Sequence, residues 1–430
     1  MASVCFYFQV HQPWRLRPYS VFDTSPLYFD DDLNKQILLK VTEKCYRPMT
    51  RLILDLIESN NGNFKVSYAL TGTVIDQLQA WAPDVIDLFK RLSDTGCCEF
   101  LAETDFHSLS FLYSREEFIE QIEAQTQRMQ DLFGQTPTVF RNTELTYNND
   151  VAHFINEIRN PDGSRRFKGM ICEGVDRILD YRSPNYLYRP PSTGDGPIVR
   201  PDGSHKPFAL LLKNYRLSDD IAFRFGNKGW EEWPLNTEKF AKWVHDINGD
   251  GYLCNLFMDY ETFGEHQWAD TGIFEFMADL PRAIFDHKPG ENHFNTPSEA
   301  LAQFETVGEY DVPHMISWAD SERDLSAWLG NAMQNNAISE CYKLERPIKD
   351  KLREAVQSGD QMAIQHYSHL MADWRKLTTS DHFYYMSTKF WADGDVHKYF
   401  SPYDSPYDSY INFMNVLDNM RTRVETVVGV

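Results

Sequence analysis

Residues 252–268, YLCNLFMDYETFGEHQW, decide the fold and the chemistry that we expect of this chain. The first half, 253–258, is a short apolar run of the kind that forms a buried parallel strand. Polar residues follow that run: Asp259, Glu261, Glu265 and His266. A carboxylate at the end of a buried strand has a fixed direction and an apolar wall that raises its pKa, which suits a general acid near neutral pH. A strand that ends in a solvated acidic turn would show the same pattern.

Working outward, six further apolar runs rich in β-formers precede this stretch. They are residues 4–10, 65–70, 97–102, 138–141, 168–172 and 208–215. Segments with apolar residues at helical spacing lie between them, such as 33–57, 74–92 with Pro83 inside it, and 114–133. In the last segment, Ser114 and Glu117 have the spacing of a capping box. Buried strands that alternate with helices predict a parallel sheet of βα units.

The pattern changes after about residue 300. Residues 324–338, 348–356 and 361–377 have helical spacing, and no apolar run of strand quality accompanies them. We therefore predict an α/β domain over residues 1–300 and a helical domain over residues 301–430. The Pro- and Gly-rich segment 184–207 is too long for a plain connector, so we expect it to form part of a substrate rim.

Charge and cysteine content restrict the partners and the compartment. The net charge of −21 and the pI of 5.0 oppose binding to nucleic acid or to an anionic membrane and suit a neutral substrate. The seven cysteines include no CxxC pair and lie largely in apolar runs, which is typical of reduced thiols. No signal peptide is evident, and no apolar run approaches the ~20 residues that span a bilayer. We expect a cytoplasmic protein. The oligomeric state stays open.

Titratable residues gather where predicted strands end. His11, Glu103, Glu144 and Asp259 stand within a few positions of an apolar run, and Glu173 and Asp219 are looser cases. Each could be an ordinary cap or turn residue. As a set they favour a binding site, because ligands of parallel βα proteins bind at the carboxyl ends of the strands.

Several carboxylates with aromatic neighbours, and no phosphate-binding loop, favour glycoside chemistry by a pair of acids. Tyr260, Phe263 and Trp268 suit stacking on a sugar ring. Strand alternation cannot choose between Asp259 and Glu261, because both have the same parity. Trp318 and Trp328 fit either a hydrophobic core or a sugar platform.

Two metal interpretations compete with the paired acids. His11, Asp105, His107 and Asp259 could hold a divalent metal as in barrel-type deacetylases, but their spacing lacks an HxxxH pattern. Residues 246–251 imitate the start of a calcium loop. The twelfth position is Phe257 where such a loop needs Glu, so we interpret this segment as a turn that enters a strand.

Five ordered segments resemble the conserved segments of glycoside hydrolase family 57, in its α-amylase-type subgroup. His11-Gln12-Pro13 resembles the first segment, and CEFLAE at 98–103 resembles the second. The third and fourth are similar to FRNTEL at 140–145 and DYETFG at 259–264. The loosest match is WADSERDLSAWLG at 318–330. The ordered set covers about three quarters of the chain and is much more specific than any one of its members.

This resemblance implies an incomplete (β/α)7 barrel followed by a C-terminal helical domain that completes the substrate site. It also implies retaining cleavage or transfer of α-1,4-glucosidic bonds in starch, glycogen or maltodextrin, without a metal or other cofactor. By this resemblance Glu144 is the nucleophile and Asp259 the acid/base. His11 and Glu103 would bind the sugar, and Asp324 or Trp328 would contribute from the helical domain.

We therefore expect Glu144 and Asp259 to be catalytic and a wider set of residues to bind substrate. The binding set is His11, Trp14, Glu103, His107, Arg141, Glu265, His266, Trp318, Asp324 and Trp328. Arg141 is included because a guanidinium near Glu144 would keep that carboxylate ionised. A 4-α-glucanotransferase is the alternative activity. A glucan-binding protein with a weak site is a further alternative, against which the two retained acids argue.

Overall fold

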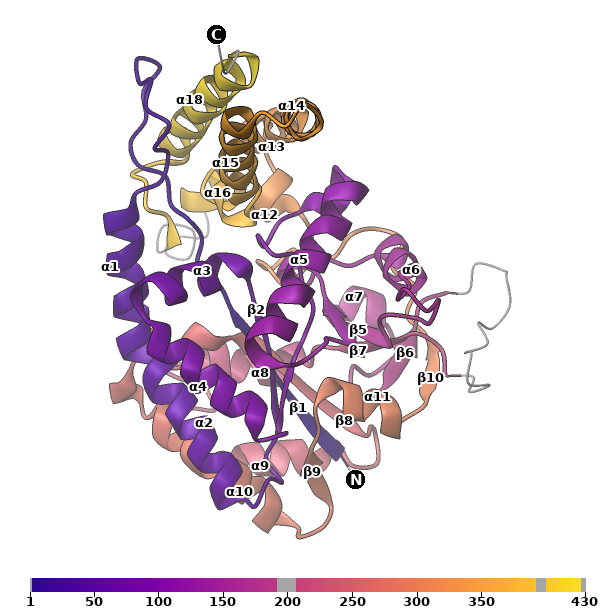
Figure 1. Cartoon of the computed structure of the whole chain (residues 1–430). Helices are drawn as coiled ribbons and strands as arrows, with labels where there is room; N and C mark the ends of the chain where they lie inside the picture. Colours follow the sequence, from indigo (N-terminus) through magenta and orange to yellow (C-terminus); the bar gives the residue numbers. More distant parts are fainter. Residues whose placement is uncertain (1, 192–205, 392–399, 427–430) are drawn as a thin grey trace. The chain divides into compact units, whose positions relative to one another are not determined.

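The computed structural model describes residues 2–191, 206–391 and 400–426, and the chain forms two compact units (Figure 1). Unit 1 contains Met1–His11, Ile37–Glu103 and Ile122–Trp318. Unit 2 contains Gln12–Gln36, Thr104–Gln121 and Ala319–Val430. Both units are discontinuous in sequence, whereas we predicted a single boundary near residue 300. The division into 1–300 and 301–430 stays a prediction.

All of the predicted strands form in unit 1. Within residues 2–191 and 206–318 they are β1 (Ala2–Val10), β2 (Val66–Leu70), β3 (Cys98–Phe100), β4 (Val139–Arg141), β5 (Gly169–Cys172), β7 (Ala209–Leu212) and β8 (Leu253–Asp259). One sheet has the order β3-β2-β1-β8, and the other places β5 between β4 and β7. All of these neighbours are parallel.

The two sheets are joined at both edges. A parallel bridge pairs Ala102 after β3 with Phe140 of β4. At the other edge, the amide of Asn214 after β7 donates to the carbonyl of Asn255 in β8 at 2.9 Å. The seven strands therefore follow one another around a ring in the order β8-β1-β2-β3-β4-β5-β7, one βα unit short of an eight-stranded barrel, which confirms the predicted incomplete (β/α)7 barrel.

Three short strands were missed from the sequence. β6 (Leu187–Arg189) pairs antiparallel with β7, β9 (Asn292–Phe294) lies beside β1, and β10 (Thr306–Glu309) lies beside β6. Each has only three or four residues, too few for a clear alternation. β6 lies inside the predicted rim segment 184–207, and residues 192–205 of that segment lie outside the described part of the chain.

Side-chain alternation along the strands builds two apolar layers. In β1, Phe6 and Phe8 pack into the cluster beneath the outer helices, whereas Cys5 and Tyr7 belong to the inner cluster. Leu101, Ile171, Leu211 and Phe257 join that inner cluster from other strands. Successive residues of a strand point to opposite faces, so a continuous apolar run supplies both layers.

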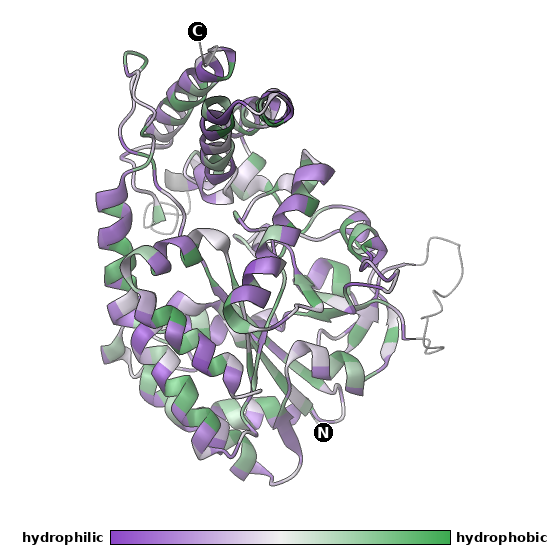
Figure 2. Cartoon of the chain, in the orientation of Figure 1, coloured by the Kyte–Doolittle hydropathy of each residue, from purple (hydrophilic) through white to green (hydrophobic). Residues whose placement is uncertain are grey.

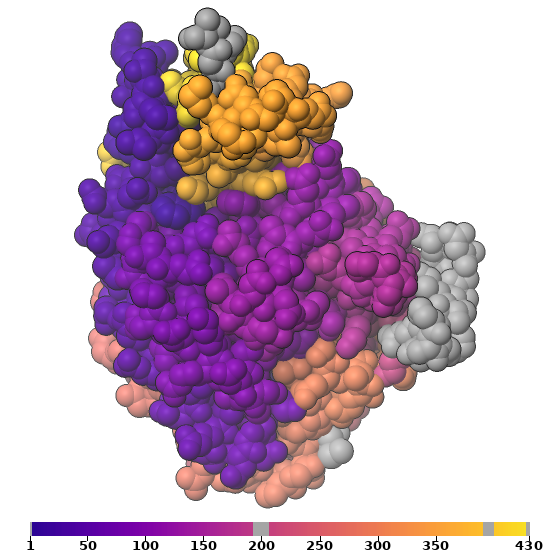
Figure 3. Space-filling model, viewed as in Figure 1, coloured from indigo at the N-terminus to yellow at the C-terminus, as the bar shows by residue number. Residues whose placement is uncertain are grey.

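The outer helices of unit 1 are amphipathic (Figure 2). They include α2 (Arg47–Ser59), α3 (Gly72–Trp81), α4 (Pro83–Asp94), α6 (Asn149–Glu157), α9 (Thr237–Asp246), α10 (Ile273–His287) and α11 (Pro297–Gln303). α2 and α4 contribute much of the face of unit 1 that Figure 3 shows. The predicted helix 74–92 divides at Pro83, because proline cannot continue the hydrogen-bond ladder.

Two helices run across the unit bounds, α1 (Asp31–Val41), which leads into the π-helical turn Thr42–Tyr46, and α5 (Arg115–Phe133). Ser114 caps α5, since its hydroxyl accepts from the amide of Glu117 at 3.1 Å, but the return bond of the predicted capping box does not form, because the Ser114 amide donates to the Ser110 carbonyl at 2.8 Å. The carboxylate of Glu117 pairs with Arg375 and Lys349 of unit 2. That ion-pair cluster anchors the start of α5 within unit 2.

Unit 2 is helical in its C-terminal part. It contains α12 (Ser326–Leu329), α13 (Ala332–Lys343), α14 (Glu345–Ser358), α15 (Gln361–Leu377), α16 (Ser380–Tyr384) and α18 (Pro406–Glu425). The predicted helix 324–338 is broken at Gly330, and Asn331 starts α13 through a capping box with Gln334. Among the described residues, no helix combines the length and the apolar character needed to cross a bilayer.

Candidate active site

Polar residues continue the inward face of the strands at their carboxyl ends. Each stands two positions after an apolar residue of the inner cluster: Gln9, Glu103, Arg141, Glu173, Lys213 and Asp259. Because side chains alternate along a strand, residues two apart share a face. The interior of the barrel is therefore apolar along the strands and polar at their carboxyl ends, where the sequence predicted the site.

A buried network links three of these residues. The Gln9 amide nitrogen donates to Oε1 of Glu103 at 3.1 Å, and the Tyr7 hydroxyl donates to Oε1 of Gln9 at 2.5 Å. Arg141 Nη1 lies 3.5 Å from Oε2 of Glu103, and both of these side chains have no exposed area. An ion pair that is this buried is costly to break, so it fixes the ends of the strands that carry it.

Glu144 lies in a strained turn just beyond β4. Its backbone has φ 58° and ψ 25°, in the left-handed region that non-glycine residues rarely occupy. The indole nitrogen of Trp318 donates to Oε2 of Glu144 at 2.7 Å, and the backbone amide of Trp318 donates to the carbonyl of Glu144 at 3.2 Å. Such strain is typical of functional sites, and here it accompanies a carboxylate that is held in place.

Asp259 ends β8 and is the register partner of Gln9 on β1. Burial is the main cause that raises the pKa of the Tyr7 hydroxyl well above its usual value. Arg141 opposes that shift, while the charges of Glu103, Asp259 and Glu144 add to it. The charges of both predicted catalytic acids therefore act in the same direction on the pKa of one phenol of the inner cluster.

The structure also distinguishes Asp259 from Glu261, which strand parity alone could not rank as the catalytic acid. Asp259 interacts with the Tyr7 phenol, whereas the carboxylate of Glu261 accepts a hydrogen bond from Tyr46 of the π-helical turn. Glu261 is buried, and Asp259 is partly exposed. The parity of the strand ends at residue 259 because a 3-10 turn, Tyr260–Thr262, follows.

Lys213 is a further charged residue of this end of the barrel, which the sequence analysis missed. Its ammonium lies 3.2 Å from Oδ1 of Asp219 and 3.6 Å from Oε2 of Glu173. It also lies over the ring of Trp318, 5.4 Å from the centroid, and the Arg141 guanidinium is 5.2 Å from the same centroid. The sequence could have identified Lys213, because it stands two positions after Leu211 and therefore shares its face of the strand.

The model of Glycosyl hydrolase family 57 matches residues 5–313. The chain belongs to this family. A protein of Methanocaldococcus jannaschii named "Putative alpha-amylase" is 41% identical over 420 residues, which cover 96% of this chain and 83% of that protein. The family, expected from five short segments, is thus confirmed over the whole barrel.

Solved structures show the same fold at low identity. A family 57 branching enzyme from Pyrococcus horikoshii has a TM-score of 0.67 and 13% identity, with 97% of this chain and 88% of that chain covered. The α-amylase AmyC from Thermotoga maritima has a TM-score of 0.60 and 12% identity, with 99% and 94% covered.

A third similar structure is the 4-alpha-glucanotransferase from Thermococcus litoralis, with a TM-score of 0.58 and 15% identity. The match covers 89% of this chain and 56% of that enzyme. This family 57 chain therefore spans little more than half the length of the glucanotransferase.

Three other predicted site residues of this family 57 member belong to unit 1. Nδ1 of His11, just after β1, lies 2.9 Å from the Thr71 hydroxyl. Glu265 pairs with Lys40 at 2.5 Å and Lys44 at 3.3 Å; burial raises its pKa, and these two cations outweigh burial and lower it. Burial lowers the pKa of His266 to about 4. Their roles in substrate binding stay predictions.

The predicted sugar-stacking aromatics differ in exposure. Tyr260 and Phe263 are fully buried in the outer apolar cluster, so the expectation that they stack on a sugar is wrong. Trp268 is 59% exposed, and Lys44 lies 5.4 Å from its ring centroid. For Trp268, stacking on a sugar stays a prediction.

The remaining predicted binding residues belong to unit 2: Trp14, His107, Asp324 and Trp328. Trp14 is buried, with the Lys376 ammonium 4.5 Å from its ring centroid. Trp328 is 1% exposed in an apolar cluster, His107 is buried with φ 51°, and Oδ1 of Asp324 accepts from the Ser326 amide at 2.8 Å. Their contribution to a substrate site stays a prediction.

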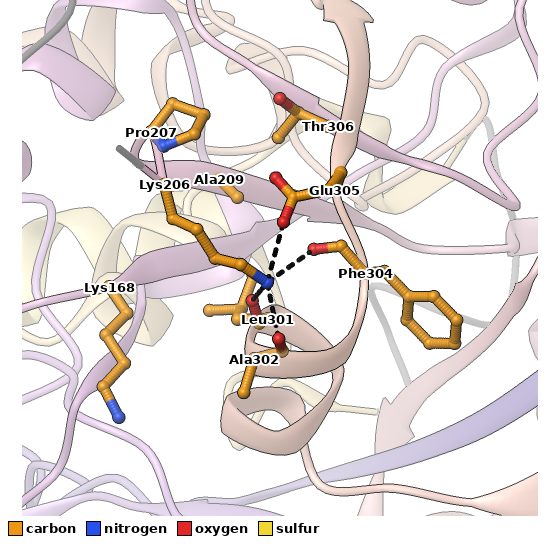
Figure 4. Close-up of a pocket in the computed structure, with 9 residues that line it drawn as sticks. All are labelled: Lys168, Lys206, Pro207, Ala209, Leu301, Ala302, Phe304, Glu305 and Thr306. Carbon is orange, nitrogen blue, oxygen red and sulfur yellow. Dashed lines mark hydrogen bonds and ion pairs between the residues drawn. The ribbon is translucent and has the colours of Figure 1, made fainter. Parts of the chain in front are cut away.

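A separate cavity of about 140 Å³ lies beside the amino ends of β5 and β7 (Figure 4). The Lys206 ammonium at its wall donates to the carbonyls of Leu301, Ala302 and Phe304, at 3.4, 2.5 and 3.3 Å, and pairs with Glu305 at 3.1 Å. These carbonyls belong to the C-terminal end of α11, which a cation stabilises. The cavity contains none of the predicted site residues.

Proposed function

We propose that this family 57 chain is a retaining glycoside hydrolase that acts on α-1,4-glucans such as starch, glycogen and maltodextrin. In this proposal Glu144 is the nucleophile and Asp259 the acid/base. The observation that carries it is the place of the two acids at the carboxyl ends of β4 and β8, with Glu144 in a strained turn and its carboxylate held by the Trp318 indole. The resemblance to other family 57 segments and the M. jannaschii relative support the substrate class.

In the first step, an oxygen of Glu144 attacks the anomeric carbon of the bound sugar. The glycosidic C–O bond breaks, and Asp259 gives its proton to the departing oxygen. The products of this step are a glycosyl ester on Glu144, an ionised Asp259 and the shortened glucan. The Trp318 hydrogen bond to Glu144 supports the ionised form of the nucleophile before attack, because a donor stabilises a carboxylate.

In the second step, Asp259 takes a proton from an acceptor hydroxyl while that oxygen attacks the anomeric carbon. The ester bond to Glu144 breaks, and the configuration is retained after two inversions. Water as acceptor gives hydrolysis. The hydroxyl of another glucan chain gives 4-α-glucan transfer, the alternative activity, which fits the glucanotransferase among the similar structures.

The decisive experiment compares wild-type protein with Glu144→Gln and Asp259→Asn on maltoheptaose. Each variant should lose about 10³-fold or more of the turnover, because each removes one half of the acid pair. Proton NMR should show that the first product carries the α configuration. Glu231→Gln is the matched control, since Glu231 is exposed and outside the predicted site. Near-wild-type turnover in either site variant would refute the assignment.

The same incubation separates the alternative functions. Shorter products alone indicate hydrolysis, and a mixture of shorter and longer chains indicates transfer. Binding of maltoheptaose without turnover would indicate a glucan-binding protein. We expect EDTA to leave the activity unchanged, and its loss would favour the metal-dependent deacetylase interpretation.

We also propose that the protein acts in the cytoplasm. All seven cysteines are free and buried, as expected of a protein kept under reducing conditions. Fractionation of the native cells tests this proposal. For the unit 2 residues we propose substrate contacts, as the family resemblance implies. Asp324→Ala should then raise KM for maltoheptaose, whereas an unchanged KM would remove Asp324 from the set.

A further inference from the structure

We propose that Trp318 orients the nucleophile instead of stacking on sugar, and that Lys213 is a positioning residue that acts on Glu144 through the Trp318 ring. This inference rests on the proposed function, because it takes Glu144 as the nucleophile. It changes the expectation for Trp318, which the sequence analysis placed among the sugar-binding residues. It also gives a role to Lys213, which the sequence analysis did not select.

Two hydrogen bonds join Trp318 to Glu144. The Trp318 indole nitrogen donates to Oε2 of Glu144 at 2.7 Å, and the Trp318 amide donates to the Glu144 carbonyl at 3.2 Å. The side-chain bond limits rotation of the carboxylate, and the backbone bond ties the strained turn to the same residue. An indole N–H is only a donor, so it supports the ionised carboxylate and cannot take its proton.

Two cationic side chains lie close to the ring of Trp318. The Lys213 ammonium and the Arg141 guanidinium lie over the ring, 5.4 and 5.2 Å from its centroid. Cations are attracted to the face of an indole. They restrain its tilt, and their field polarises the ring so that the N–H becomes a stronger donor. Both effects act on the hydrogen bond to Glu144.

Lys213 is buried and is held by two ion pairs. Its side chain is only 4% exposed, and its ammonium is within 3.2 Å of Asp219 and 3.6 Å of Glu173. These carboxylates come from separate segments, α8 (Tyr215–Asp219) and the end of β5. The ammonium thus has a fixed place between two acids and the ring of Trp318.

The test is the pH dependence of kcat/KM, and several other groups share this end of the barrel with Glu144. The charged and titratable groups placed there by strand parity, ion pairs or electrostatic interaction are Tyr7, His11, Glu103, Arg141, Glu173, Lys213, Asp219 and Asp259. A variant must therefore change the donor to Glu144 and leave these groups in place. Trp318→Phe meets this condition, because it removes the N–H donor, keeps an aromatic ring beside the cations and changes no charge.

Trp318→Phe should lower kcat on maltoheptaose by about 10-fold, the expected effect of losing one hydrogen bond to a charged group. A carboxylate that loses a donor is protonated more easily, so the acidic limb of kcat/KM should move about one unit to higher pH. KM should stay unchanged. A raised KM with the limb in place would overturn the proposal and make Trp318 a sugar platform.

Lys213→Met should move the same limb in the same direction, and Lys213→Arg should restore it. If Lys213 acts through the indole, its substitution should add nothing in a Trp318→Phe background. Additive effects would overturn the role of Lys213. Should Lys213→Met fail to fold, Asp219→Asn loosens the anchor of the ammonium and should give a smaller shift of the limb. No shift in this folded variant would equally overturn the role.

Trp374→Phe is the matched control. It removes an indole N–H that donates to the Cys341 carbonyl at 2.8 Å within unit 2, and it should leave the acidic limb unchanged. Different results would contradict the proposed function and the role of Trp318. A wild-type protein with no turnover at any pH contradicts the proposed function. An active wild-type protein whose limb does not move in Trp318→Phe contradicts this inference alone.

Discussion

Gln9 on β1 and Asp259 on β8 are register partners at the carboxyl end of the barrel. The same Gln9 side chain accepts from Tyr7 at 2.5 Å and donates to Glu103 at 3.1 Å. An amide can donate and accept at once, so its oxygen accepts from the phenol while its nitrogen donates to the carboxylate. The backbone that carries Asp259 therefore lies beside a polar network with little freedom.

Tyr7→Phe should destabilise the protein by about 1–2 kcal/mol, because it removes a buried hydrogen bond and leaves Oε1 of Gln9 without that donor. Loosening of Gln9 should also reduce kcat several-fold. Urea unfolding and turnover of maltoheptaose measure the two effects. Tyr188→Phe removes a hydroxyl that donates to the Ser183 carbonyl at 2.7 Å and should leave turnover unchanged. Equal activity in both variants would contradict a role for Tyr7.

Glu144→Gly should be more stable than Glu144→Ala. The backbone at residue 144 has φ 58°, which glycine adopts freely and alanine does not, so we expect a difference of about 1 kcal/mol in favour of glycine. Both variants lack the carboxylate, so the comparison isolates the backbone strain. Chemical denaturation measures it. Greater stability of the alanine variant would show that the turn is not strained.

Arg141→Met should reduce the free energy of unfolding by about 3–5 kcal/mol, because it leaves the fully buried Glu103 charge without this partner. Adding Glu103→Leu should recover much of that loss, since two apolar side chains need no counter-charge. Arg282→Met is the control at an exposed pair, Arg282–Asp286, and should cost at most about 1 kcal/mol. Similar losses at the two arginines would argue against a buried pair.

His266→Gln should flatten the dependence of stability on pH. Burial lowers the pKa of His266 to about 4, with Glu265 and Lys40 acting in opposite directions. Between the ordinary value near 6.5 and this value, the unfolded chain binds a proton that the folded chain does not. The wild-type free energy of unfolding should therefore fall as the pH drops from about 6.5 to about 4, by at most about 3 kcal/mol.

The check is urea unfolding at several pH values in that range, with His314→Gln as a control at an exposed histidine. Parallel curves for wild type and His266→Gln would show that His266 titrates no differently in the folded and unfolded chains.

Local pattern in the sequence was sufficient for the barrel strands and for Glu103, Glu173 and Asp259 at their ends, whereas Gln9 and Lys213 were not selected. Residues 253–258 form a strand because the run is apolar on both faces and bounded by turn residues, and both signals lie within a few positions of one another. The strand end that carries Asp259 follows from the same local signal. Glu144 was different, because its turn has no periodicity, and it was identified by the family resemblance of FRNTEL.

Tertiary structure decided which of these side chains meet. Trp318 and Glu144 are 174 positions apart, and their hydrogen bond exists only because the chain returns to the end of β4 after completing the barrel. Periodicity reports the burial of one element and says nothing about its neighbours. For this reason the roles of Tyr7 and Lys213, and the different surroundings of Asp259 and Glu261, became visible only when the strands were closed into a ring.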